Sequence, residues 1–90
     1  MTAHYTYQHL VELVGGDEEL ILELVERGVI ERRDGDRVLV DVEEVLIVRT
    51  LWRDLELDWP GIEVVLRLRA ELAAARKRIG ELEARLGGAP

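Results

Sequence analysis

The final third of the chain has the pattern of one long helix with a narrow apolar seam. Asp58 can cap its free amides, Pro60 fits a first turn where no amide is required, and the pattern continues to Leu86. Apolar residues recur within it at alternating steps of three and four, namely Val65, Leu68, Leu72, Ala75, Ile79, Leu82 and Leu86. Heptad spacing of this kind requires a partner helix. We therefore expect a homodimer with an interface made by Leu72, Ala75, Ile79, Leu82 and Leu86.

The preceding part, residues 1–57, is divided by glycines into short elements. Thr6 can cap a first helix to about Val14, and Asp17 can cap a second of about ten residues that ends at Gly28. Two helices joined by so short a glycine turn are typical of a helix-turn-helix unit, which needs a third element to bury both apolar faces. The second helix has a predicted buried stripe of Leu20, Ile21, Leu24 and Val25.

A small β-wing and a third helix supply the missing element. Residues 29–33 and 36–40 favour strands and flank Asp34-Gly35, a dipeptide suited to a two-residue hairpin turn. Asp41 can start a third helix to about Glu56, with a predicted buried stripe of Val45, Val48, Trp52 and Leu55. The predicted fold class is mainly α: a winged helix-turn-helix head over residues 1–57, a long coiled-coil dimerisation helix over 58–86 and a disordered tail over 87–90.

Composition excludes several classes of function. The chain contains neither Cys nor Ser, so neither a serine or cysteine nucleophile nor a thiolate metal site can form. His4 and His9 lack the spacing of metal ligands. We expect no enzymatic activity, no cofactor and no metal. The longest apolar run, Val45–Val48, is far short of the roughly 20 residues that cross a bilayer, so we expect a cytoplasmic protein without a membrane segment.

The negative charge lies before the long helix. The whole chain has 19 Asp and Glu against 12 Lys and Arg, for a net charge of -7. Residues 1–28 carry six acids and one base, residues 29–58 nine and five, and residues 59–90 four and six, which gives -5, -4 and +2. Arg32, Arg33 and Arg37 surround the wing tip, where the DNA backbone could be contacted, but Asp34 and Asp36 lie among them. DNA binding through the wing alone is expected to be weak and salt-sensitive.

The order of elements resembles that of MerR-type winged-helix regulators. Tyr5-Thr6 and the later run Glu26-Arg27-Gly28-Val29-Ile30 are similar to their N-terminal signature. The resemblance implies an antiparallel dimer and a second helix that carries Arg and Tyr into DNA. At the corresponding positions this chain has Glu19, Leu22, Glu23 and Leu24, and its acidic residues on or beside the outward side of that helix are Glu18, Glu19, Glu23 and Glu26. Phosphate would be repelled by this helix.

A second resemblance concerns the start of the long helix. The run Leu57-Asp58-Trp59-Pro60-Gly61-Ile62 is similar to the most recognisable segment of the CbpM family of chaperone modulators, which are MerR-like themselves. The resemblance implies a protein that binds the J-domain of a CbpA- or DnaJ-type co-chaperone and inhibits its action with DnaK, without catalysis.

Charge and periodicity, rather than either resemblance, indicate where such a partner would bind. Leu22 lies about 200° from Leu20 around the second helix, at roughly 100° per residue, and so points outward among glutamates. The predicted partner-binding residues are Glu19, Leu22, Glu23 and Glu26. The alternative function is a MerR-family transcriptional regulator that binds DNA through the wing and the second helix, with Arg32, Arg33 and Arg37 on the DNA backbone.

Overall fold

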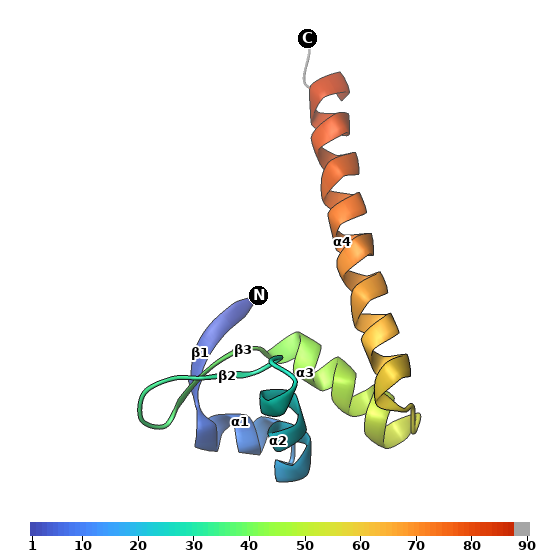
Figure 1. Cartoon of the computed structure of the whole chain (residues 1–90). Coiled ribbons are helices and arrows are strands. Elements are labelled where there is room, and N and C mark those ends of the chain that lie inside the picture. The colour runs from blue at the N-terminus through green and yellow to red at the C-terminus, as the bar shows by residue number, and fades with distance from the viewer. Residues whose placement is uncertain (88–90) are drawn as a thin grey trace. The chain divides into compact units, whose positions relative to one another are not determined.

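The computed structural model describes residues 1–87, which are mainly helical with one small antiparallel sheet (Figure 1). The chain divides into two compact units, Met1–Leu57 and a second that begins at Asp58. The first unit contains three strands, three α-helices, a π-helical turn and nearly all of the buried residues, and the second is a single helix. This architecture confirms the predicted fold class of a mainly α head with a wing and a long C-terminal helix.

The sheet has one more strand than the sequence predicted. Its order is β1 (Thr2–Thr6), β3 (Arg37–Asp41) and β2 (Glu31–Arg32), and both pairings are antiparallel. Strand β1 pairs along its whole length with β3. No residue of β1 is fully buried, so the strand has no apolar run by which it could be recognised. It is defined by backbone pairing with residues more than 30 positions away.

The turn of the wing is longer than expected. The amide of Arg33 donates to the carbonyl oxygen of Arg37 at 2.9 Å, which leaves Asp34, Gly35 and Asp36 as a three-residue loop. The prediction of a two-residue turn was therefore wrong, whereas the expected left-handed conformation is found at Gly35, with a φ of 70°. Three-residue hairpin loops commonly use a glycine in this conformation.

Helices α1 (Tyr7–Leu13) and α2 (Glu18–Glu26) confirm the predicted caps. The Thr6 hydroxyl accepts from the His9 amide at 3.0 Å, and the Asp17 carboxylate accepts from the Leu20 amide at 3.2 Å. Gly15 and Gly16, with φ of 67° and 82°, reverse the chain between them. This left-handed pair costs a β-carbon-bearing residue about 1–2 kcal/mol per position, which explains why glycine separates the helices so sharply.

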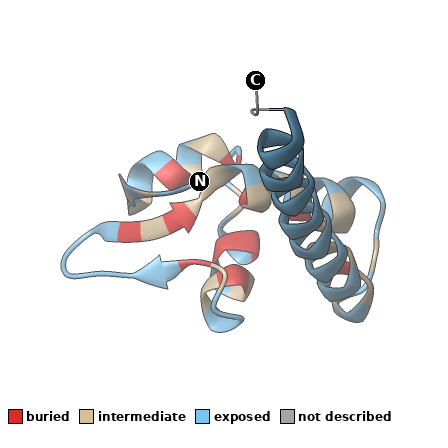
Figure 2. Cartoon of the chain, turned by 90° about the horizontal axis from the view of Figure 1, so that it is seen from above, coloured by how far each residue is buried: buried red, intermediate tan, exposed pale blue. Residues whose placement is uncertain are grey.

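The core of the first unit contains residues from its three α-helices and from the wing (Figure 2). From α2 it takes Leu20, Ile21 and Leu24, as the periodicity predicted, whereas Val25 is only half-buried. The remaining fully buried side chains of this unit are Leu10, Val14, Ile30, Val38, Val40, Val45 and Val48. Burying this set against water is the main force that stabilises so small a unit.

The third helix ends in a π-helical turn that the sequence did not predict. Helix α3 (Val42–Arg49), capped by Asp41 as expected, continues into η1 (Thr50–Asp54). A π turn holds more residues than an α turn and therefore rotates the following residues off the helix stripe. Val45 and Val48 are buried as predicted, but Trp52 is half-buried and Leu55 is 61% exposed. The prediction of Leu55 as a core residue was wrong.

The second unit is helix α4 (Trp59–Gly87), whose predicted start is confirmed. The Asp58 carboxylate accepts from the Gly61 amide at 2.8 Å. The helix includes Gly87, which had been assigned to a disordered tail, and residues 88–90 of that predicted tail lie outside the described residues. No helix among residues 1–87 is both long enough and apolar enough to cross a bilayer.

Candidate functional site

The outward side of α2 presents an exposed leucine among glutamates. We call Glu19, Leu22, Glu23 and Glu26 the α2 face, because steps of three and four place them on one side of the helix. The Glu19 side chain is 72% exposed, Leu22 is 60% exposed, Glu26 is exposed and Glu23 is half-buried. The opposite side carries the buried Leu20, Ile21 and Leu24. The structure thus brings together the four residues predicted for partner binding.

Two of the three carboxylates of the α2 face have ion pairs within the unit. Glu23 pairs with Arg27 one turn later at 3.3 Å, and a nitrogen of Arg53 lies 3.6 Å from Glu19. Both are surface pairs in high dielectric, a class that contributes little to stability. Little free energy is therefore lost when a cationic group of a partner replaces Arg27 or Arg53 beside these carboxylates.

A bidentate ion pair holds the start of α2 against the π turn. The Arg53 guanidinium donates to both Asp17 oxygens, at 2.7 and 2.8 Å, and its carbon lies 3.9 Å from the centroid of the Trp52 ring. The hydrogen bond from Arg53 lowers the pKa of Asp17, more than its partial burial raises it, and the same bond raises the pKa of Arg53. The sequence did not reveal this pair, because 36 positions separate the two residues.

Acid is expected to weaken the first unit through Asp17. Because its folded-state pKa lies below the ordinary value of 3.8, the charge of Asp17 contributes stability at higher pH. That contribution is lost as the pH falls below about 4 and through the folded pKa. Asn is also a good N-cap, so Asp17→Asn should reduce the loss of unfolding free energy at low pH while the start of the helix is kept. Urea titrations across this pH range measure the free energy of unfolding. If that free energy fell with pH as steeply in Asp17→Asn as in the unmodified chain, Asp17 would not be the group responsible.

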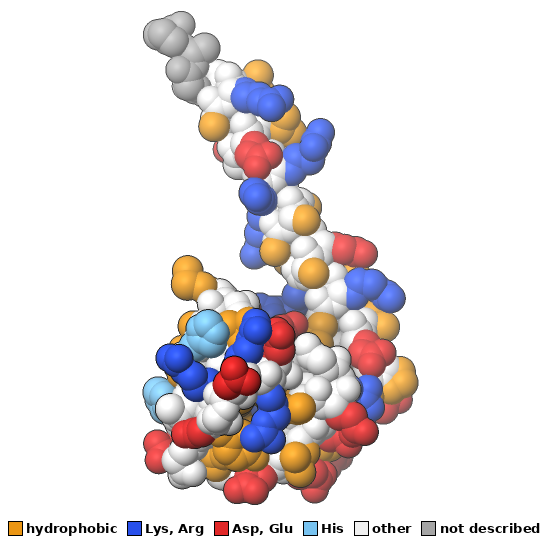
Figure 3. Space-filling view, turned by 60° about the vertical axis from the view of Figure 1, so that its left-hand side comes forward, with side chains coloured by type: hydrophobic (Ala, Val, Ile, Leu, Met, Phe, Trp, Pro, Cys, Tyr) orange, Lys and Arg blue, Asp and Glu red, His pale blue; other side chains and the backbone are white. Residues whose placement is uncertain are grey.

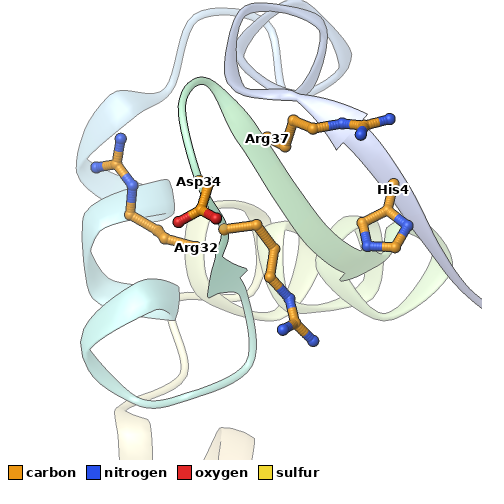
Figure 4. A pocket seen from close by; sticks show the side chains of 5 residues that line it. His4, Arg32, Asp34 and Arg37 are labelled. Carbon is orange, nitrogen blue, oxygen red and sulfur yellow. The ribbon is translucent and has the colours of Figure 1, made fainter.

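The three wing arginines and His4 line a shallow hollow together with Asp34 (Figure 4). His4 comes from β1, the strand that the sequence did not predict, and is brought beside the wing by pairing with Leu39. Arg33 lies 3.4 Å from Glu31, and the Arg32 guanidinium carbon lies 5.1 Å from the Tyr7 ring centroid. The arginine side chains point in different directions (Figure 4). We call Arg32, Arg33 and Arg37 the wing fringe; because their side chains diverge, they do not form a receptor for one small anion.

The visible face of the first unit has no continuous basic field. Figure 3 shows Lys and Arg side chains interspersed with Asp and Glu over the wing side of this unit. Residues 1–57 carry 14 acidic and six basic side chains, a net charge of -8. A duplex that approached the wing would meet this excess of negative charge, which reduces both its association rate and its affinity.

The seam of α4 is exposed from Leu68 to Leu86, whereas Val65 is half-buried (Figure 2). Of the residues predicted for the dimer interface, Leu72 is 49% exposed, Ile79 54%, Leu82 42% and Leu86 83%, and Ala75 is exposed as well. A row of large apolar side chains at heptad spacing is typical of a helix that packs against another helix.

The part of the chain that the structure describes contains no fully buried polar or charged residue. Within residues 1–87 there is also no group of three His, Cys, Asp or Glu residues that could hold a metal ion.

Comparison with known proteins identifies the family of this chain. The family model described as MerR HTH family regulatory protein matches residues 5–84. A search of curated proteins gave no match. The matched region extends from β1 through both head helices, the wing and α3 to nearly the end of α4. The chain therefore belongs to the MerR helix-turn-helix family of regulatory proteins.

Proposed function

We propose that this protein regulates a co-chaperone of the CbpA or DnaJ type by binding its J-domain and inhibiting its action with DnaK. The observation that carries the proposal is the α2 face, where Leu22 is 60% exposed between the exposed Glu19 and Glu26. An exposed apolar anchor inside an acidic rim fits a basic protein surface. The apolar side chain holds the complex by packing, and the charges accelerate its formation.

The identity of the partner rests on the segment that leads into α4. Asp58 caps this helix and Pro60 follows in its first turn, and the run from Leu57 to Ile62 resembles the CbpM family. J-domains present a basic helix to their chaperone, so an acidic helix face could compete for the same surface. Blocking that surface would prevent the co-chaperone from stimulating DnaK.

Truncation of the anchor tests the proposal. Isothermal titration of the full chain with the purified J-domain of a co-chaperone from the same source should show binding, and Leu22→Ala should weaken it by about tenfold, which corresponds to about 1.4 kcal/mol. Leu55→Ala is the matched control, because Leu55 is equally exposed but lies outside the α2 face. Absence of binding by the unmodified chain would reject the proposed function.

Inhibition is measured separately from binding. In a steady-state assay of DnaK ATP hydrolysis stimulated by the co-chaperone, added protein should lower the rate toward the unstimulated value, and Leu22→Ala should require a correspondingly higher concentration. Binding without any change in the stimulated rate would retain the contact but reject the inhibitory role.

DNA binding is a second candidate, favoured by the wing fringe and by the family match. The fringe has three arginines without the support of a basic second helix, so we expect weak binding that is lost as salt rises toward about 0.2 M. Fluorescence anisotropy with duplex DNA over a salt series measures this, with Arg32→Ala/Arg37→Ala as the matched variant. Tight binding at high salt that this variant abolishes would make DNA the principal ligand.

A further inference from the structure

The sheet of the first unit has two edges, and they differ in how they are protected. The β2 edge has only two residues, Glu31 and Arg32, and both are charged. The β1 edge has five residues, Thr2–Thr6, which include no Pro, Lys, Arg, Asp or Glu, and its register with β3 is unbroken. Short length, charged side chains, proline and bulges are the devices that usually keep an edge strand from pairing with another chain. The β1 edge has none of them.

The outer edge of β1 carries backbone groups that β3 does not use. The amide of Tyr7, which follows β1 directly, donates to the carbonyl oxygen of Asp36 at 2.6 Å. Backbone groups in an antiparallel strand pair point alternately toward and away from the neighbouring strand. Counting back from Tyr7, the amides that point away from β3 are those of Thr2, His4 and Thr6. No other strand within residues 1–87 pairs with this edge.

The side chains of β1 alternate between the two sides of the sheet. Thr2, His4 and Thr6 are exposed, whereas Tyr5 lies on the core side and is half-buried. The Tyr5 ring meets the His9 ring edge to face, with 5.4 Å between the ring centroids. Successive side chains of a strand added beside β1 would therefore lie alternately against Tyr5, where apolar groups are favoured, and beside the exposed row.

Positive charge borders the exposed side of this edge. Arg37 pairs with Thr6 in the register, and its side chain runs from β3 across β1 in Figure 4. The first 11 residues of the chain contain no Asp or Glu. The one acidic residue that pairs with β1 is Asp41, opposite Thr2, and it already accepts from the amide of Glu44 as the cap of α3. The local charge therefore favours an acidic partner.

An extended peptide fits this edge better than a compact anion or a duplex. Its backbone can bond the outward groups of β1, which a compact anion cannot do, while a carboxylate on its exposed side reaches the Arg37 guanidinium. A short peptide contacts only this strip of the unit, and charges farther than about 8 Å away are largely screened at physiological ionic strength. The net charge of -8 on residues 1–57 therefore opposes such a peptide less than it opposes a duplex that spans the unit.

We propose that β1 is a docking edge for an extended acidic segment of another protein, which joins the sheet as a fourth strand antiparallel to β1. Backbone hydrogen bonds to Thr2, His4 and Thr6 supply affinity, and the alternating side chains of the segment supply specificity. Its acidic residues lie on the exposed side near Arg37, and its apolar residues cover Tyr5. This inference is independent of the proposed function, since the α2 face takes no part in the contact.

Removal of one outward amide tests the contact in the full chain. The probe is a dye-labelled synthetic peptide of about eight residues in which Glu alternates with Val, and fluorescence anisotropy measures its affinity. His4→Pro removes an amide that does not bond β3, and an edge strand tolerates proline at such a position. The fold should therefore persist in circular dichroism while the affinity falls about tenfold or more.

His4→Ala is the matched control, because it removes the imidazole but keeps the amide. It should leave the affinity nearly unchanged, whereas Arg37→Glu should weaken binding by bringing a carboxylate beside the peptide. Equal losses in His4→Pro and His4→Ala, or no binding by the unmodified chain, would overturn the proposal. If duplex DNA displaced the peptide and His4→Pro still bound it normally, the surface would bind anions through its side chains alone, which would also overturn the proposal.

Amide hydrogen exchange of the unmodified chain is an independent measurement that needs no variant to fold. Without the peptide, the amides of His4 and Thr6 should exchange rapidly and that of Tyr5 slowly, because only the Tyr5 amide points toward β3. A saturating concentration of the peptide should slow exchange at His4 and Thr6. Unchanged exchange at both amides would overturn the proposal. Protection of His4 that rises with protein concentration alone would also overturn it, because a second copy would then occupy the edge.

Discussion

Replacing Leu24 with alanine is expected to lower the free energy of unfolding of the first unit by about 2–5 kcal/mol. Leu24 is fully buried in the last turn of α2, and its carbonyl oxygen accepts from the amides of Val29 and Ile30, at 2.9 and 3.2 Å, where the chain turns toward the wing. A domain of this size has only about 3–9 kcal/mol of stability in total. The substitution should therefore leave a large fraction of the unit unfolded at ambient temperature.

Urea unfolding followed by tryptophan fluorescence measures the effect. In a Trp59→Phe background the signal comes from Trp52 alone, which lies in the first unit and is half-buried. Leu22→Ala is the matched control, since it makes the same chemical change on the same helix at a residue that is 60% exposed. It should shift stability by less than about 0.5 kcal/mol. If the two variants lost stability equally, α2 would not have an outward side and the α2 face would be wrongly assigned.

The elements that sequence predicted well are those with local signals. Each of the four predicted caps accepts a hydrogen bond from the amide of the third residue of the helix that follows; these caps are Thr6, Asp17, Asp41 and Asp58. A side chain that caps a helix acts over one turn, so the sequence alone contains the necessary information. The same holds for the α2 face, because a period of 3.6 residues determines which residues lie opposite Leu20 and Leu24.

The features that were missed depend on residues far apart in the chain. Strand β1 exists because it pairs with β3, and the bond between Asp17 and Arg53 links the start of α2 to a π turn. That turn also rotates Leu55 into solvent, against the prediction from a regular helical period. No window of neighbouring residues carries these signals.

The affinities for a J-domain and for DNA both depend on the acidic residues of α2. Carboxylates on α2 attract a basic protein surface and repel phosphate, so one substitution set should change the two affinities in opposite directions. Neutralising a single surface charge would have a small effect, because pairs such as Glu23 with Arg27 are largely solvated. Reversal of several charges at once is required to distinguish the models.

The combined substitution Glu19→Lys/Glu23→Lys/Glu26→Lys is expected to weaken J-domain binding on the order of 100-fold, since each like-charge contact replaces an attraction with a repulsion. Isothermal titration measures the affinity, and a salt series should show that the loss shrinks as charges are screened. The matched control is Glu12→Lys/Asp54→Lys/Glu56→Lys, which makes the same change in net charge at exposed positions of the same unit. An equal loss in both variants would attribute the effect to overall charge. An unchanged affinity in the first would remove the α2 face from the interface.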